Sequence, residues 1–192
     1  FPADRFRSRR AFVASTAASA FSFMVVPRHV LGGPDHTAPS DRVNFAGIGA
    51  GGMGGDDIRQ VAKLGANVVA LCDVDDVSAA RNYEIFPQAR RYKDFREMLD
   101  REEHHIDAVT VGTPDHLHAV ASMAALRRGK HVYCEKPLAH SVHEAHVVRQ
   151  TYKLSKVATQ MGTQIHAGNT FRRVVELIRS GAIGPVREAH VW

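Results

Sequence analysis

Cysteine is scarce in this sequence, and several motifs that would mark common enzyme classes are missing. Only two of the 192 residues are cysteine, too few for a scaffold held together by disulfides. Neither a Gly-x-Ser-x-Gly turn nor a Walker-type lysine occurs. The sequence therefore gives no support for a serine hydrolase or for phosphoryl transfer.

Long apolar runs and clusters of basic residues are also lacking. The uncharged stretch 14–26 is too short to cross a bilayer, which needs about 20 apolar residues. The net charge is +5, but residues 1–31 hold five arginines and one aspartate, so residues 32–192 carry only +1. No later run of Lys and Arg follows, and we expect no nucleic-acid partner.

Histidine, in contrast, is abundant. His140, His143 and His146 are spaced by three residues, and the segment from His143 to His146 is one residue short of the H-E-x-x-H zinc motif. This spacing favours a solvated helix face over a ligand set. We predict no metal site.

The amino-terminal segment is typical of an export signal. The pair Arg9-Arg10 is followed by Phe12 and then by the weakly apolar stretch 14–26. This pattern resembles a twin-arginine signal, which passes folded proteins to the export machinery. We predict that residues 1–33 are signal and junction, and that the protein is periplasmic or otherwise exported. The alternative is an amphipathic or membrane-anchoring helix.

The overall composition is that of a soluble α/β protein. Hydrophobic residues make up 44% and charged residues 23%, as in ordinary globular domains. A chain of this length can hold one domain and the beginning of a second. The sequence begins with Phe1 and ends in an apolar run at Trp192, so we expect a piece of a longer protein.

A glycine-rich segment joins a predicted strand, 43–48, to a predicted helix, 55–64. Its G-x-G-x-x-G spacing is that of a dinucleotide-binding turn, in which the backbone approaches a diphosphate at a helix N-terminus. The predicted cofactor contacts in this segment are Gly49, Gly51, Gly52, Met53 and Gly54. The alternatives are a frame that begins at Gly47 and a merely flexible loop.

An acidic residue stands where such a site needs one. The predicted strand 67–72 ends at Asp73, which lies 19 residues after Gly54, close to the ~20 expected for the acid that holds the ribose hydroxyls. A carboxylate there repels a 2′-phosphate, and residues 74–76 contain no arginine to accept one. NAD is therefore favoured over NADP. The alternative is an unrelated surface aspartate.

Strands and helices continue to alternate along the chain. Helices are predicted over 78–85, 95–99, 116–128 and 142–155, and strands over 90–92, 106–111, 131–134 and 157–161. This rhythm predicts the α/β Rossmann fold, a doubly wound parallel sheet of strand order 3-2-1-4-5-6. Two polar segments, Thr113-Pro114-Asp115 and Glu135-Lys136-Pro137, then follow strands at the edge where such sheets bind ligands.

Together these motifs resemble the Gfo/Idh/MocA family of oxidoreductases, from about residue 43 to residue 192. The resemblance is carried by Gly49 to Gly54, Asp73, Thr113-Pro114-Asp115 with His118, and Glu135-Lys136-Pro137. It implies that Thr113, Pro114, His118, Glu135 and Lys136 lie beside the cofactor. It also places Lys136 at the nicotinamide and the reacting hydroxyl carbon, as the catalytic residue.

A lysine at that place suits the chemistry, because oxidation of a secondary alcohol needs a group that stabilises the alkoxide or relays its proton. Simpler alternatives exist for each residue. Lys136 could be a solvated strand-end lysine, and Glu135 either orients it or simply ends the strand. His118 is either a neighbour of the nicotinamide or a structural hydrogen-bonding residue.

The resemblance further implies two domains. Residues 34–165 form the NAD-binding domain, and residues 166–192 begin an open-sheet substrate domain with a helix over 168–180 and a strand over 186–192. Gln164 and His166 fall between the domains and are candidate ligand contacts. Because family members continue into a complete second domain, we expect this chain alone to be inactive and the full-length protein to be a homo-oligomer.

Three functions are consistent with the sequence. The first is hydride transfer between NAD and a sugar, cyclitol or related polyol. The second is an NAD-dependent glycosidase that oxidises its sugar only transiently, as the resemblance implies for some exported members. The third is a dinucleotide-binding module without catalytic activity.

Overall fold

The computed structural model describes residue 33 and residues 37–191. It divides the chain into two compact units, Phe1–Arg42 and Val43–Trp192. In the first unit the described part contains one short 3-10 helix, η1 (Pro39–Asp41). The predicted signal, residues 1–33, lies outside the described residues except for Gly33, so it stays a prediction.

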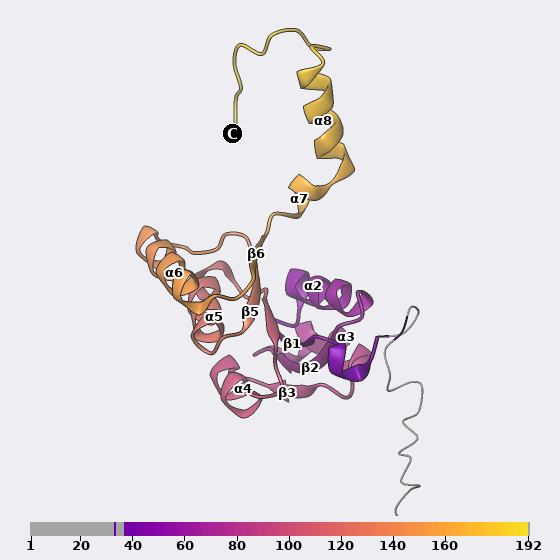
Figure 1. Cartoon of the computed structure of the whole chain (residues 1–192), viewed down its shortest axis with the longest axis vertical. Helices are drawn as coiled ribbons and strands as arrows, with labels where there is room; N and C mark the ends of the chain where they lie inside the picture. Colours follow the sequence, from indigo (N-terminus) through magenta and orange to yellow (C-terminus); the bar gives the residue numbers. More distant parts are fainter. Residues whose placement is uncertain (1–32, 34–36, 192) are drawn as a thin grey trace, which may run out of the picture. The chain divides into compact units, whose positions relative to one another are not determined.

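The second unit is built on a six-stranded parallel sheet. Its strands are β1 (Asn44–Ile48), β2 (Asn67–Cys72), β3 (Arg90–Tyr92), β4 (Ala108–Val111), β5 (His131–Glu135) and β6 (Thr159–Gly162). They lie in the order β3-β2-β1-β4-β5-β6; all except β4 are labelled in Figure 1. This order confirms the predicted doubly wound sheet. β2 and β3 lie on one side of β1, and β4 to β6 lie on the other. Between β1 and β4 this change of side leaves a crevice at the carboxyl ends of the strands, where such sheets bind ligands.

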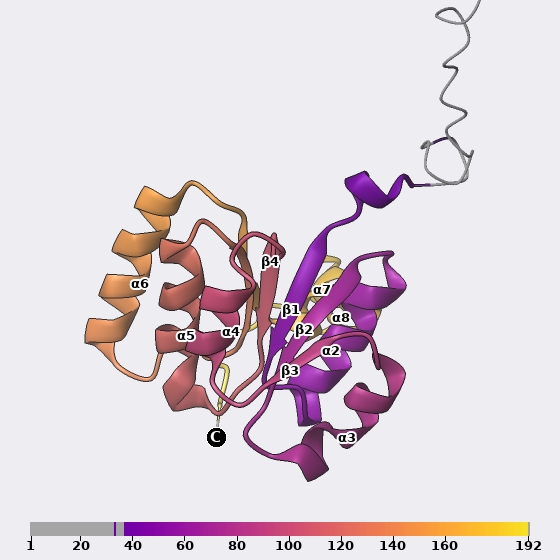
Figure 2. The same cartoon turned by 90° about the horizontal axis from the view of Figure 1, so that it is seen from below.

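Helices cover both faces of the sheet (Figure 2). On one face lie α2 (Gly52–Lys63) and α3 (Asp76–Ile85); on the other lie α4 (Phe95–Arg101), α5 (Asp115–Arg127) and α6 (Val142–Ser155). Two apolar clusters correspond to these two layers. Met98 and Leu99 anchor the first and Ile58 the second, all three fully buried. Burial of each such side chain contributes about 1.5 to 3 kcal/mol, which fixes the helices on the sheet.

Side-chain caps define where several helices begin. The Asp75 carboxylate accepts from the Val77 N–H at 2.9 Å at the start of α3, and Asp94 accepts from the Arg96 N–H at 2.8 Å at the start of α4. Ser141 and Glu144 form a complete capping box at α6. Such caps are worth about 1 kcal/mol each. They hold the helix N-termini near the strand ends that carry the candidate site.

Apart from the strand predicted over 186–192, the predicted elements agree with the observed ones to within three residues at each end. The largest difference is at α2, which begins at Gly52 rather than at residue 55. Glycine is a poor helix former, so the sequence pattern gives no helical signal for Gly52 to Gly54. Tertiary contacts of the glycine segment, described below, hold that first turn in place.

The last part of the chain contains two helices, α7 (Gln164–Ala167) and α8 (Asn169–Arg179). The predicted helix 168–180 is confirmed as α8. The strand predicted over 186–192 is wrong for residues 186–191, which have no regular structure. A strand needs a neighbour to pair its N–H and C=O groups, and none of the described segments pairs with it. No helix in the described part of the chain has the length and apolarity to cross a membrane.

We expect both cysteines to remain free and poorly reactive in the folded protein. Cys72 on β2 and Cys134 on β5 are buried and unpaired, and they lie three strand spacings apart, about 14 Å, beyond disulfide reach. Burial raises the pKa of Cys72 to about 12 and that of Cys134 to about 11, so little reactive thiolate forms near neutral pH. Thiol titration without reductant should find two groups in denaturant and very slow labelling of the native chain. A count below two would contradict the strand placement.

Candidate functional site

The glycine segment between β1 and α2 is shaped by close backbone contacts. Gly49 has a φ of +86°, and a Cβ added to it would lie 2.6 Å from the backbone of Gly112, which follows β4. A Cβ on Gly54 would lie 2.9 Å from the Gly112 Cα. Only glycine fits at these positions. Gly47 instead lies inside β1, so the motif frame is the one that begins at Gly49.

The same segment presents the start of α2 to the ligand edge. A side chain on Gly51 would collide with the Ser78 hydroxyl of α3, so the loop runs close over α3. The Gly55 N–H donates to the Gly51 carbonyl at 2.8 Å, and the N–H groups of Gly52, Met53 and Gly54 form the first turn before this bond. Free N–H groups and the positive end of the helix dipole make this turn a site for an anion such as a diphosphate.

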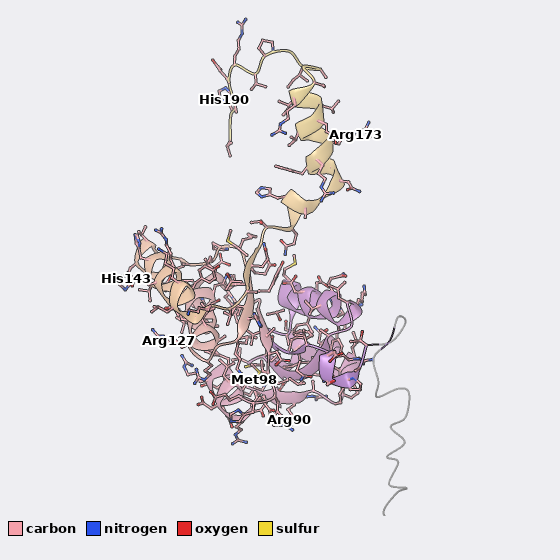
Figure 3. The ribbon with its side chains drawn as sticks, in the orientation of Figure 1. Arg90, Met98, Arg127, His143, Arg173 and His190 are labelled. Carbon is pink, nitrogen blue, oxygen red and sulfur yellow. The ribbon has the colours of Figure 1, made fainter. Side chains whose placement is uncertain are left out.

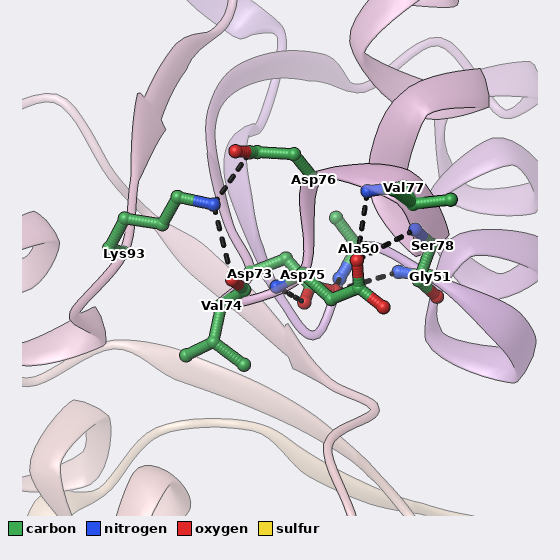
Figure 4. Close-up of polar contacts among 9 residues, drawn as sticks. All are labelled: Ala50, Gly51, Asp73, Val74, Asp75, Asp76, Val77, Ser78 and Lys93. Carbon is green, nitrogen blue, oxygen red and sulfur yellow. Dashed lines mark hydrogen bonds and ion pairs between the residues drawn. The ribbon is translucent and has the colours of Figure 1, made fainter.

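The Asp73 carboxylate ties the glycine segment to the end of β2 (Figure 4). Its Oδ2 accepts from the N–H groups of Ala50 at 2.8 Å and Gly51 at 3.0 Å, and its Oδ1 accepts from the Asp75 N–H at 2.9 Å. A carboxylate offers about four acceptor positions. Three are used within the protein, which leaves Asp73 one free position for a ligand hydroxyl.

Lys93 is a site residue that the sequence analysis missed. Its ammonium donates to the Val74 carbonyl at 3.2 Å and pairs with the Asp76 carboxylate at 2.6 Å (Figure 4). Its position in the sequence could have predicted this, because Lys93 directly follows β3, whose carboxyl end lies at the same edge of the sheet as that of β2. The cation is matched by Asp76, and the carboxylates of Asp73 and Asp75 lie nearby.

These groups line one cleft of about 420 Å³ at the carboxyl ends of β1, β2 and β4. The cleft brings together predicted site residues from three separate segments, namely Gly49, Gly51, Gly52, Met53, Asp73, Thr113 and Pro114. The Thr113 hydroxyl oxygen is buried without a hydrogen-bond partner. A dinucleotide fits this set, because the helix turn suits its diphosphate, Asp73 a ribose hydroxyl, and Thr113 a further polar group.

His118 lies behind the cleft and not in it. Its buried ring has Nδ1 2.6 Å from the Pro137 carbonyl oxygen and Nε2 2.7 Å from the Thr113 carbonyl oxygen. Both ring nitrogens are thus engaged with backbone carbonyl groups of the protein. The geometry therefore favours the structural alternative, in which His118 links the segment after β4 to the segment after β5.

The two polar residues at the end of β5 have different environments. The Lys136 side chain is exposed, whereas Glu135 is buried and accepts hydrogen bonds from Tyr133 at 3.4 Å and from Gln164. Gln164, a predicted ligand contact, is thus engaged with Glu135. His166 packs against Phe171 with ring centroids 4.8 Å apart. Neither Glu135 nor Lys136 lines the cleft at β1, β2 and β4.

The histidines spaced by three form no metal site. His143 and His146 are exposed on α6, and His143 lies on the outer side of that helix in Figure 3. His140 precedes the helix and lies 3.2 Å from the Glu144 carboxylate. Within the described residues no group of three or more His, Cys, Asp or Glu side chains could hold a metal ion.

Known proteins share this sequence and fold. Residues 43–163 match the Gfo/Idh/MocA oxidoreductase family, whose fold is an NAD-binding Rossmann fold. An inositol 2-dehydrogenase of Arthrobacter sp. is 31% identical over 154 residues, which cover 79% of this chain and 45% of that protein. An alpha-N-acetylgalactosaminidase of Shewanella oneidensis is 28% identical over 74% of this chain and 32% of its own length.

A solved structure supports the fold. The scyllo-inositol dehydrogenase of Lactobacillus casei, with bound NAD(H) and scyllo-inositol, superposes with a TM-score of 0.65 at 23% identity, over 74% of this chain and 42% of that one. This chain thus spans less than half the length of these relatives. The match over residues 43–163 and the glycine motif in its cleft lead to one conclusion: the chain belongs to the Gfo/Idh/MocA family of oxidoreductases with an NAD-binding Rossmann fold.

Proposed function

We propose that this chain is the NAD-binding part of an oxidoreductase that transfers hydride between the nicotinamide and a secondary hydroxyl of a sugar, cyclitol or related polyol. The observation that carries the proposal is the cleft in which Asp73, at the end of β2, accepts hydrogen bonds from the glycine segment. Membership of the family supports the cofactor and the reaction class. The relative from Arthrobacter, named an inositol 2-dehydrogenase, supports a polyol as the substrate.

Different residues of the cleft bind different parts of the cofactor in this proposal. The first turn of α2 holds the diphosphate through its N–H groups, and the free acceptor position of Asp73 takes a ribose hydroxyl. When bound, NAD supplies the hydride acceptor. The acidic surroundings of Lys93 disfavour a further phosphate on the ribose, so we propose NAD rather than NADP as the cofactor.

Lys136 is the proposed catalytic residue. When a secondary alcohol is oxidised, the carbon loses a hydride and the oxygen loses a proton, so negative charge develops on the oxygen. The Lys136 side chain follows a strand at the ligand edge and is exposed. Its ammonium can stabilise the alkoxide, and its amine can take the proton.

A glycosidase is the second candidate. The relative from Shewanella oneidensis, named an alpha-N-acetylgalactosaminidase, supports it. Such an enzyme would oxidise its sugar transiently and regenerate NAD within one cycle. Incubation of the complete protein with NAD and polyols or glycosides separates the two, because NADH accumulates only in the dehydrogenase.

We also propose a location and an assembly state for the whole protein. The paired arginines at positions 9 and 10 and the uncharged stretch after them support export through the twin-arginine machinery. Residues 166–192 are proposed to begin the substrate domain, and the complete protein is proposed to be a homo-oligomer.

We expect the chain to bind NAD at least about tenfold more tightly than NADP, since a bond to a charged acceptor is worth about 1.5 to 3 kcal/mol. Asp73→Asn should weaken NAD binding and narrow the gap between the cofactors, because the repulsion of a 2′-phosphate is lost. Glu84→Gln is the matched control, because it removes an exposed carboxylate of α3 that does not line the cleft, and it should leave NAD affinity nearly unchanged. Calorimetric titration with both cofactors measures these affinities. Equal or tighter binding of NADP by the unmodified chain would contradict the cofactor assignment.

In the complete protein, Lys136→Ala should lower kcat by about 10² to 10⁴, the usual contribution of a proton-transfer group. NAD affinity should change much less, because the proposed role lies in the reaction step. Lys130→Ala is the matched control. Lys130 precedes β5 at its opposite end, so its loss should leave kcat unaltered. Steady-state kinetics with NAD and a polyol substrate provide the test, and a normal kcat in Lys136→Ala would make Lys136 a solvated strand-end residue.

A further inference from the structure

Four polar side chains from three elements meet beside the end of β5. Asp57 comes from α2, Tyr133 and Glu135 from β5, and Gln164 from α7. Asp57 is only 9% exposed and Glu135 only 5%. Gln164 donates to the Glu135 carboxylate, and both Glu135 and Gln164 act on the Asp57 carboxyl. Two acidic groups are therefore buried together.

When both carboxyls are ionised, this cluster lacks one hydrogen-bond donor. Glu135 Oε1 accepts from Gln164 and Tyr133. Asp57 Oδ2 is buried and has no donor. No Lys or Arg side chain in the described part of the chain forms an ion pair with either acid. A proton held between the carboxyls would supply the missing donor and remove the repulsion between two like charges.

The packing around the pair is tight. A Cβ on Gly162 of β6 would lie 2.9 Å from the Tyr133 hydroxyl and would collide with Glu135 Oε1. This close approach of β6 leaves the Glu135 carboxyl little room to move. Burial, and then the charge of Glu135, raise the pKa of Asp57 to about 7.

We propose that Asp57 and Glu135 share one proton, and that this proton fixes the end of β5, and with it Lys136, against the helix that carries the glycine segment. Asp57 is then a positioning residue, which acts through Glu135. The shared proton itself follows from the buried cluster alone. Its effect on the ligand site rests on the proposed function.

Three other groups surround the carboxyl pair. Asp56 on α2 adds a like charge, which raises the pKa of Asp57 slightly further. The Tyr133 phenol on β5 has its pKa raised to about 12 by burial and by both acids, so it stays a neutral donor. From α7 the cluster is faced by Gln164, which carries no charge. The proton on the carboxyl pair is thus the one that changes near neutral pH.

The raised pKa of Asp57 makes the stability of the folded chain depend on pH. The folded chain keeps a proton that the unfolded chain releases near the ordinary value of 3.8. The stabilisation is therefore complete below about pH 4, declines as the pH rises to about 7, and is absent above it. Between these limits the unfolding constant should rise about tenfold per pH unit from this group alone.

The first experiment observes the proton directly. In the chain labelled with ¹³C at Asp carboxyls, NMR should show one resonance that titrates near pH 7. It should be missing from Asp57→Asn and present in Asp56→Asn, a matched control that removes the same charge from the exposed side of α2. Asp57→Asn replaces the shared proton with an amide donor, so it should also lose the tenfold-per-unit slope in the unfolding constant. If Asp57→Asn does not fold, Glu135→Gln provides the same donor from the other side.

The absence of any Asp resonance titrating above about pH 6, or an unchanged slope in the folded variants, would overturn the shared proton. The second experiment tests its effect on the site by NAD titration at about pH 6 and about pH 8.5. The unmodified chain should bind several-fold more weakly at the higher pH, because the ionised pair repels and loosens β5 from α2. Asp57→Asn should bind equally at both.

The two proposals fail in different ways. If the carboxyl titrates near pH 7 but NAD binds at neither pH, the proposed cofactor is wrong and the shared proton stands. If NAD binds equally at both pH values and no carboxyl titrates, the shared proton is wrong and the cofactor stands. If the carboxyl titrates and NAD affinity is the same at both pH values, the positioning role of Asp57 is wrong.

Discussion

The arrangement of the site depends on the contact between two glycine backbones, Gly54 at the start of α2 and Gly112 at the end of β4. There is no space for a Cβ on either residue. The contact therefore brings the positive end of α2 over the point where the strand order reverses. Any side chain at either position would lift the helix from β4, and the first-turn N–H groups would no longer face the cleft.

Asp73 adds a second constraint, since it bonds both to the glycine segment and to the turn after β2. With three of about four acceptor positions used, a ligand that presents two hydroxyls to Asp73 must displace one backbone bond. This would couple ligand binding to the conformation of the segment from Ala50 to Gly51. Asp73 thus stabilises the glycine segment and, in the proposed function, also helps to select the ligand.

The sheet order and nearly all elements could be predicted because apolar runs and glycine positions record local burial and turns. The cleft contacts of Gly49, Asp73 and Thr113 followed from the rule that parallel strands end at one edge. Lys93 could have been placed by the same rule, because it directly follows β3. Asp57 and the buried pairing of Glu135 could not be found this way, because they depend on which side chains meet across elements. The wrong strand at residues 186–191 has the same origin, since a strand is specified by its partner as much as by its own residues.

Two halves of the candidate site are built in different ways. The half at β1 and β2 is held by backbone N–H groups that donate to the Asp73 carboxylate. The half at β4 and β5 is held by side chains that link separate segments. His118 bridges the Thr113 and Pro137 carbonyls, and the buried acids meet across α2 and β5. A change of charge on the buried acids would act on the end of β5 and, through Asp57 on α2, on the helix that carries the glycine segment. The shared proton thus couples the end of β5, which carries the proposed catalytic residue Lys136, to the helix that carries the glycine segment, so that the proposed pH dependence reaches both halves of the site.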